Sequence, residues 1–165
     1  MVLRSLIAAF KRLFSVEEAH AHCDIPCGIY DPHLAQIAAL SVIRMVQLIE
    51  QLPNTSDAAN QHLLSRYTAV KEEHAELVKK EVRIIWGDYF KPEHLEKYPD
   101  LHKTVWNIMK LGSKARQEIN MQASQDLLAE VQRFAEAFWD SKGAATRRQP
   151  SLQTVGGELV IPSPA

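Results

Sequence analysis

The sequence predicts an all-α protein, an up-and-down four-helix bundle that follows an irregular N-terminal hook. Three observations support this fold class. Apolar residues recur at helical spacings of three and four along four long stretches, the connections between the stretches are modest, and no run shows the alternation typical of strands. The chain has 165 residues, of which 46% are hydrophobic, so it can bury one ordinary core.

The first helix is predicted to run from His33 to about Leu52. Asp31 and Pro32 come directly before it, a carboxylate suited to the N-cap and a proline suited to the first helical position. Its apolar residues occupy more than one face, so we expect it to be buried on more than one side. The second helix is predicted from Ala58 to Trp86, where apolar residues again recur at spacings of three and four.

The second half of the bundle is predicted to begin after an irregular, aromatic-rich connection from Gly87 to Pro99. The third helix is predicted from Asp100 to Leu111, where Gly112 would stop it. The fourth helix is predicted from Lys114 to Ser141, because its large apolar residues fall on one seam. The four helices together give the bundle.

Both ends of the chain are predicted to lie outside the bundle domain, which we place at residues 22–142 with the hook at 22–30. Residues 1–21 are interpreted as a cleavable leader, since they are basic and amphipathic and end in Ala19-His20-Ala21, which imitates a signal cleavage site. The apolar part of the leader is short and interrupted by basic residues, so we expect a cytoplasmic protein, with export as the alternative. Residues 143–165 are rich in Gly, Pro, Ser, Thr and Gln, and we expect a disordered C-terminal tail.

The charge balance restricts the possible partners. The chain carries 19 basic and 20 acidic residues, a formal net charge of −1. This balance argues against nucleic acid or an anionic membrane as a partner. No apolar run reaches the roughly 20 residues needed to cross a bilayer. We therefore expect neither nucleic acid nor membrane among the partners.

The two cysteines of the chain, Cys23 and Cys27, lie in one short segment, so the fold is not a disulfide scaffold. Three residues separate them, whereas the dithiol redox motif has two and opens a helix after a strand. A structural zinc site would need two further ligands, and the remaining histidines show no zinc-like spacing. His22 distinguishes the segment, because it places an imidazole beside two thiols.

Cleavage between Ala21 and His22 would add a free amine to this set of donors. The amine, a deprotonated backbone amide and two thiolates can form a square plane of two nitrogens and two sulfurs. That geometry is typical of nickel or copper rather than zinc. The imidazole of His22 could then approach the metal axially.

The nine residues His22-Cys-Asp-Ile-Pro-Cys-Gly-Ile-Tyr30 resemble the nickel hook of the nickel superoxide dismutase family. A second block, Trp86-Gly-Asp-Tyr-Phe-Lys-Pro92 and on through Glu96-Lys-Tyr-Pro99, is similar to the family too, and the likeness extends from His22 to about Lys142. The resemblance implies a precursor whose leader is removed by a processing protease. It also implies a homohexamer of four-helix-bundle subunits, one nickel ion per subunit cycling between its divalent and trivalent states, and superoxide as the substrate, converted to dioxygen and hydrogen peroxide.

The resemblance also implies the metal ligands. They would be the amine and imidazole of His22, the amide nitrogen and thiolate of Cys23, and the thiolate of Cys27. Asp24 and Pro26 would shape the hook, the proline through the cis bond that only proline adopts at low cost.

Around the hook, the resemblance implies further roles. Tyr30 would stand at the mouth of the site, limit access to small species and hold ordered water, with Tyr89 as its hydrogen-bonding neighbour. Lys91 would attract superoxide. The chain departs from the family at Ala38 and His74, where members often carry a glutamate and an arginine that hold the axial imidazole. His74 could take over part of that role, or it could be a histidine of the core or of a subunit contact.

Two other functions remain open. The chain could be a non-enzymatic helical bundle whose hook holds nickel or copper without catalysis. It could also be a helical assembly protein that uses its cysteines only structurally.

Overall fold

The computed structural model describes residues 28–54 and 56–163. The predicted leader lies outside the described residues, as do five predicted site residues of the hook: His22, Cys23, Asp24, Pro26 and Cys27.

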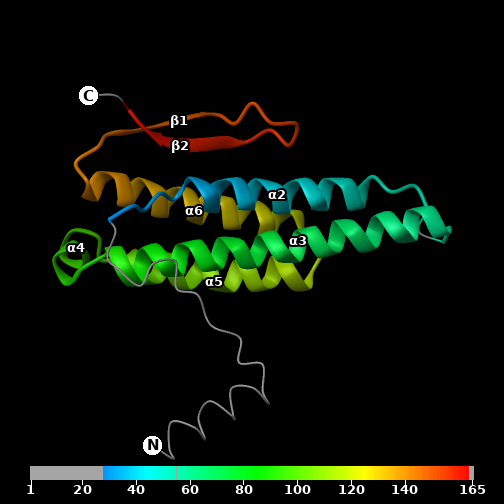
Figure 1. The fold of residues 1–165 in the computed structure, drawn as a ribbon, viewed down its shortest axis with the longest axis horizontal. Coiled ribbons are helices and arrows are strands. Elements are labelled where there is room, and N and C mark those ends of the chain that lie inside the picture. The colour runs from blue at the N-terminus through cyan, green and yellow to red at the C-terminus, as the bar shows by residue number, and fades with distance from the viewer. Residues whose placement is uncertain (1–27, 55, 164–165) are drawn as a thin grey trace, which may run out of the picture.

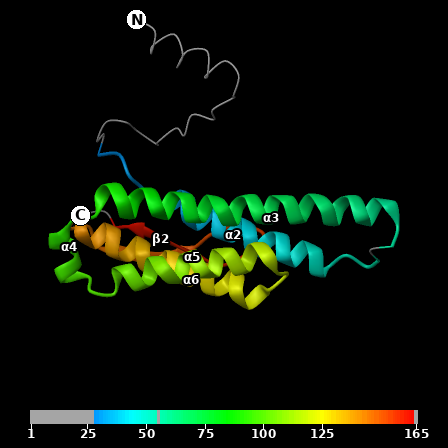
Figure 2. The same ribbon diagram turned by 90° about the horizontal axis from the view of Figure 1, so that it is seen from below.

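Four long helices form the body of the molecule: α2 (His33–Glu50), α3 (Ala58–Ile84), α5 (Leu101–Gln117) and α6 (Met121–Ser141). Helix α2 packs against α3 and α6, and α5 packs against the same two helices (Figure 1 and Figure 2). Consecutive helices are therefore neighbours around the bundle. The predicted all-α, up-and-down four-helix bundle is confirmed.

A polar side chain accepts a hydrogen bond from the backbone at the start of three of these helices. The carboxylate of Asp31 accepts a hydrogen bond from the backbone nitrogen of His33 at 2.7 Å, before α2. Asp57 is the N-cap of α3 and accepts from the nitrogen of Asn60 at 2.9 Å. Asn120 is the N-cap of α6 and accepts from the nitrogen of Ala123 at 2.9 Å. These side chains satisfy backbone donors that have no partner inside the helix.

Gly112 does not end the third helix, contrary to the sequence prediction. Helix α5 runs through it to Gln117, and α6 begins at Met121 rather than at Lys114. Gly112 is buried, and a Cβ at this position would lie 2.9 Å from the Cγ of Lys79 on α3. The glycine is therefore used for close approach of two helices rather than for a turn.

The connection from Gly87 to Pro99 is more regular than predicted. Helix α3 continues into a π-helical turn, η1 (Ile85–Tyr89), and a short helix, α4 (Pro92–Lys97), follows it. A proline at the first helical position favours the start of α4, because the missing N–H has no partner there in any case. The short α4 lies at one end of the bundle (Figure 1). Tyr89 is the last residue of η1, shortly before this helix.

The predicted disordered tail is wrong, because residues 146–162 form a β-hairpin. Strands β1 (Thr146–Pro150) and β2 (Glu158–Pro162) pair antiparallel, with Arg148 opposite Val160. The hairpin lies against α2 and α6 (Figure 1). Leu159 and Val160 are 5% and 1% exposed, so the hairpin buries apolar side chains that repay its ordering.

Two glutamines of the bundle hold β2 in place. Gln36 of α2 is fully buried, donates to the carbonyl oxygen of Val160 at 3.0 Å and accepts from its nitrogen at 2.7 Å. Gln132 of α6 donates to the carbonyl oxygen of Glu158 at 2.8 Å. The two side chains thus satisfy the outer edge of β2 as a third strand would.

A buried lysine of α3 caps the C-terminal end of α5. Lys71 of α3 is 1% exposed, and its ammonium donates to the carbonyl oxygens of Ala115, Arg116 and Glu118 at 2.5, 2.9 and 3.0 Å. These carbonyls belong to the C-terminal end of α5, where a positive charge is favourable. Burial lowers the pKa of Lys71 from its usual 10.5, against the attraction of Glu72.

Helix α2 is the one helix among the described residues that is long and apolar enough to cross a membrane by length and composition. It lies near the N-terminus, and half of it is buried inside the bundle. Its residues Ala35, Ala39, Val42 and Val46 have no exposed surface, which is the pattern of a core helix.

Candidate metal centre

The structure brings together the two tyrosines that the sequence assigns to the mouth of the site. Tyr30 is the last residue of the hook, and Tyr89 ends η1, 59 positions later in the numbering. Their ring centroids are 5.9 Å apart, and both rings pack against the core. Gly28, two residues before Tyr30 in the hook, has a φ of +71°, a conformation that favours glycine. The first described residues and α4 lie at the same end of the bundle (Figure 1).

The surroundings of Tyr89 come from α4 and from the end of α6. Its hydroxyl lies 2.8 Å from the Oγ of Ser141. Its ring stacks on His94 at 5.6 Å between centroids and meets the ring of Phe138 at 4.8 Å. The ammonium of Lys142 lies 5.3 Å from the centroid of the Tyr89 ring, within reach of a cation–π interaction.

Lys91 is exposed and lies two residues after Tyr89 in the same connection. Its backbone nitrogen donates to the Nδ1 of His94 at 3.0 Å, and its carbonyl oxygen accepts from the nitrogen of His94 at 3.0 Å. The backbone of Lys91 therefore begins α4, while its charged end faces solvent. Its role in attracting superoxide stays a prediction.

The two departures from the family pattern lie on α2 and α3. Ala38 is 1% exposed, and its methyl group offers nothing to an imidazole. His74 is half-buried, and its Nδ1 lies 2.8 Å from the carbonyl oxygen of Val70 in its own helix. Because a carbonyl only accepts, Nδ1 carries the hydrogen, and Nε2 is the nitrogen left for another partner when the ring is neutral. The role of His74 toward the hook stays a prediction.

A network at the end of α4 fastens this region to α6. The hydroxyl of Tyr98 donates to the Oδ2 of Asp140 at 2.5 Å, and the ammonium of Lys97 lies 2.9 Å from the same oxygen. The hydrogen bonds from Tyr98 and Lys97 hold the pKa of Asp140 below its usual value. Burial and the bond to Asp140 raise the pKa of Tyr98.

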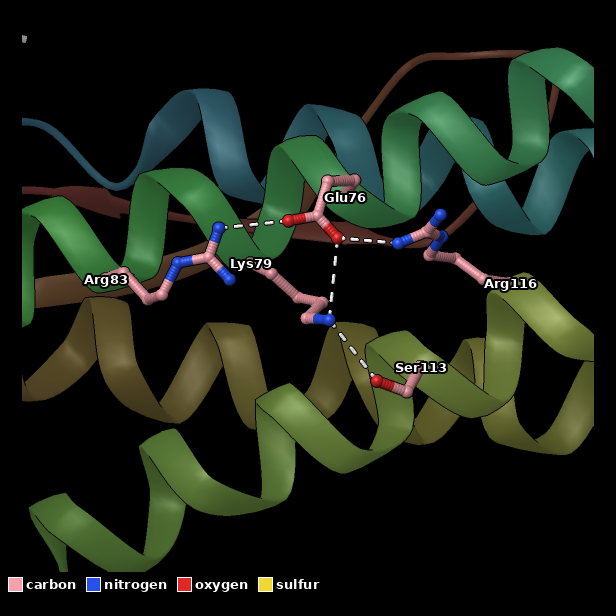
Figure 3. Close-up of polar contacts among 5 residues, drawn as sticks. All are labelled: Glu76, Lys79, Arg83, Ser113 and Arg116. Carbon is pink, nitrogen blue, oxygen red and sulfur yellow. Dashed lines mark hydrogen bonds and ion pairs between the residues drawn. The ribbon is translucent and has the colours of Figure 1, made fainter. Parts of the chain in front are cut away.

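A charged cluster outside the predicted site joins α3 to α5 (Figure 3). The carboxylate of Glu76 lies 2.9 Å from Arg83, 2.9 Å from Arg116 and 3.4 Å from Lys79. Lys79 also donates to the Oγ of Ser113 at 3.2 Å. Burial alone would raise the pKa of Glu76, but the bonds from Arg83 and Lys79 outweigh it and lower the pKa. The cluster has a structural explanation in holding two helices together.

Comparison with known proteins decides the family. The model of the nickel-containing superoxide dismutase family matches residues 17–142 of the chain. The chain belongs to this family. A nickel superoxide dismutase of Streptomyces coelicolor is 41% identical over 134 residues, which cover 81% of this chain and 98% of the relative. One of Streptomyces seoulensis is 39% identical with the same coverage.

Solved structures agree with this membership of the nickel-containing superoxide dismutase family. A native nickel superoxide dismutase structure is 40% identical, with a TM-score of 0.66, and the match covers 73% of this chain and 99% of that one. A structure of the metal-free form has a TM-score of 0.64 at 38% identity. The family identified from the nine-residue hook is therefore confirmed. The β-hairpin lies beyond residue 142, where the family match ends.

The chemistry of the predicted donors fits nickel. Among residues 28–54 and 56–163, no group of three or more histidine, cysteine or carboxylate side chains could hold a metal ion. The predicted ligands His22, Cys23 and Cys27 precede this part of the chain. Two thiolates with nitrogen donors suit a square-planar nickel or copper site, and the family is a nickel family.

The sequence analysis missed three residues around Tyr89: His94, Ser141 and Lys142. They contact Tyr89 through stacking, a hydrogen bond and a cation over the ring. Ser141 and Lys142 are 52 and 53 residues from Tyr89 in the numbering, at a helix end with no motif of its own. Only packing of α6 against η1 and α4 identifies them.

Proposed function

We propose that this chain disproportionates superoxide to dioxygen and hydrogen peroxide at a nickel ion held by its N-terminal hook. The observation that carries the proposal is the hook sequence His22 to Tyr30 in a member of the nickel-containing superoxide dismutase family. The 5.9 Å between the rings of Tyr30 and Tyr89 supports it, because these two residues would form the entrance. The overall change consumes two superoxide anions and two protons and yields one dioxygen and one hydrogen peroxide.

The ligands would come from three residues of the hook. His22 would supply its amine and imidazole, Cys23 its amide nitrogen and thiolate, and Cys27 its thiolate, with Asp24 and Pro26 shaping the turn. Bound nickel would supply a one-electron couple that accepts an electron from one superoxide and gives it to the next. The amine of His22 exists only after the bond to Ala21 is cut, so the active form requires a processing protease.

The described residues would control access and charge. Tyr30 and Tyr89 would leave room only for small species such as superoxide and water. Lys91 and Lys142 would place two positive charges beside this entrance, which favours approach of an anion although the chain carries a net charge of −1. His74 would stand in for the arginine of other members, through the Nε2 that the bond to Val70 leaves available.

The remaining parts of the proposal concern assembly and location. We propose a homohexamer with one nickel ion per subunit, in the cytoplasm, with no nucleic acid or membrane partner. The near-neutral charge supports the absence of such partners. Mass photometry of the nickel-loaded protein would measure the number of subunits.

The decisive experiment compares chains that differ by one residue at the N-terminus. A chain that begins at His22 is expected to bind one nickel ion and to remove superoxide rapidly in stopped-flow assays. A chain that begins at Ala21 keeps every side chain of the hook but moves the amine by one residue, so it should lack both properties. Equal activity of the two nickel-loaded chains would contradict the proposed ligand set.

The same assay separates catalysis from simple metal binding. Replacement of Cys23 or Cys27 by serine should abolish redox-competent nickel binding, because each change removes a soft thiolate. If the chain that begins at His22 binds nickel fully but does not accelerate superoxide decay, it is a metal-binding bundle. Ala38 and His74 are the departures that favour this second candidate.

A further inference from the structure

The ring of Tyr89 is confined by its neighbours. Phe138 and Phe90 meet it at centroid distances of 4.8 and 5.1 Å, and His94 stacks on it with an angle of 11° between the planes. The ammonium of Lys142 lies 5.3 Å from its centroid. Aromatic and cation–π contacts at these distances are attractive, so the ring has little freedom to move. The main freedom left to Tyr89 is the direction of its hydroxyl hydrogen.

Ser141 determines that direction. The Oγ of Ser141 donates to the carbonyl oxygen of Phe138 at 2.6 Å, and a carbonyl oxygen can only accept. A serine hydroxyl has one hydrogen, which this bond uses. In the 2.8 Å contact between Ser141 and Tyr89, the tyrosine must therefore be the donor. The Oη of Tyr89 then has only lone pairs to offer any other partner.

The helix end that carries Ser141 is itself well held. Gly143 has a φ of +73°, and the nitrogens of Gly143 and Ala144 donate to the carbonyl oxygens of Asp140 and Trp139, each at 3.0 Å. A glycine in this conformation is a common end of a helix. The hairpin starts three residues later, and the nitrogen of Ser163 donates to the carbonyl oxygen of Ala145 at 2.7 Å. Ser141 thus sits on a backbone that is bonded on both sides.

We propose that Ser141 is a positioning residue of the site. Its Oγ accepts a hydrogen bond from the hydroxyl of Tyr89, so that Tyr89 acts toward entering molecules as a hydrogen-bond acceptor only. This proposal rests on the proposed function, in which Tyr89 and Tyr30 form the entrance. Water and hydrogen peroxide carry hydrogen and can donate to Tyr89. Superoxide is an anion without hydrogen, so Tyr89 does not hold it, and the anion passes on to the metal.

The first test reads the hydrogen bond directly on the metal-free protein. The intensity ratio of the tyrosine doublet in the Raman spectrum distinguishes a hydroxyl that donates from one that only accepts. The difference spectrum against Tyr89→Phe isolates Tyr89. Ser141→Ala should weaken the donor signature of Tyr89, because the hydroxyl loses this fixed acceptor, and Ser141→Thr, which keeps a hydroxyl, should retain it. An unchanged signature in Ser141→Ala, or its loss in Ser141→Thr, would overturn the proposal.

The second test uses azide as a small anion that competes with superoxide at the nickel-loaded enzyme. In Ser141→Ala the hydroxyl of Tyr89 is free to turn and donate, so azide should inhibit about tenfold more strongly, as expected for one added hydrogen bond to an anion. Azide should inhibit Ser141→Thr as strongly as it inhibits the unchanged chain. Equal azide inhibition in all three proteins would refute the role of Ser141 at the entrance.

These outcomes are separable from failure of the proposed function. If the unchanged chain bound nickel but did not remove superoxide, the proposed function would fail while the Raman comparison would still test the bond to Ser141. Should Ser141→Ala not fold, as judged by its thermal midpoint, Ser141→Cys provides the same loss, because a thiol is a weak acceptor. Its retention of the donor signature would count against the proposal.

Discussion

Replacement of Gln36 by leucine tests whether the C-terminal hairpin is an integral part of the fold. Gln36 and the backbone of Val160 exchange two hydrogen bonds, at 2.7 and 3.0 Å, and both residues are at most 1% exposed. Leucine keeps similar bulk but leaves the buried N–H and C=O of Val160 without these partners. Each buried group left unsatisfied costs about 1–3 kcal/mol, and the added apolar burial offsets roughly 1 kcal/mol. We therefore expect a loss of about 1–5 kcal/mol in the free energy of unfolding.

Gln47→Leu is the matched control, because Gln47 lies on the same helix and bonds to the same hairpin. Its Nε2 donates to the carbonyl oxygen of Val155 at 3.3 Å, and both residues are half-buried. Water can replace this bond, so the loss should be about 0.5–1 kcal/mol. Urea unfolding at one fixed protein concentration measures both variants, since assembly would make the stability depend on concentration.

Hydrogen exchange adds the local readout. The amide of Val160 should lose most of its protection in Gln36→Leu, while the amides of α3 and α5 keep theirs. The reasoning would be refuted if Gln36→Leu were no more destabilising than Gln47→Leu, or if the exchange of the Val160 amide did not change. Either result would mean that the hairpin does not depend on the glutamine.

Two further predictions concern titratable groups. Lys71→Met should lower the free energy of unfolding by about 2–4 kcal/mol, measured by urea unfolding, because three carbonyls at the end of α5 lose their donor. Because burial lowers the pKa of Lys71, the folded state loses this proton at a lower pH than the unfolded state does. The difference in the free energy of unfolding between the unchanged chain and Lys71→Met should therefore widen as the pH rises toward 10.5. A gap that narrows with rising pH would contradict the sign. Asp140→Asn should lower the thermal midpoint at neutral pH through the loss of the ion pair with Lys97 and the charge-assisted bond from Tyr98. Because the pKa of Asp140 is held down in the folded state, the two midpoints should converge as the pH falls below 3.8 and through that lowered pKa, and a difference that persisted in acid would count against this explanation.

The sequence was sufficient for the family and the bundle because both are encoded by near neighbours. The hook places His22, Cys23 and Cys27 within six consecutive residues, so these three could be predicted as metal ligands without a fold. Apolar periodicity likewise acts over a few residues, and the helices predicted to begin at His33 and Ala58 begin there. Features that depend on residues close in the sequence can therefore be predicted from the sequence.

The sequence predictions were wrong where a residue's role depends on a contact with a distant part of the chain. Gly112 is a residue type common at helix ends, but here its lack of a side chain makes room for Lys79 of another helix. The tail has the composition of a disordered segment, but Gln36, more than a hundred residues away, supplies the partners of its second strand. Neither partner is visible until the helices are packed.

What the sequence by itself determined is the family and the fold class: a segment with two thiols and an imidazole that is typical of the family, and an all-α bundle. What only the tertiary structure decided is the surroundings of that chemistry. Tyr30 and Tyr89 come together only in the folded chain. The hydrogen bond from Tyr89 to Ser141 likewise depends on how the end of α6 packs against η1 and α4. Metal donors close in sequence are specified by covalent connection, whereas the direction of one hydroxyl is specified by packing between segments some fifty residues apart.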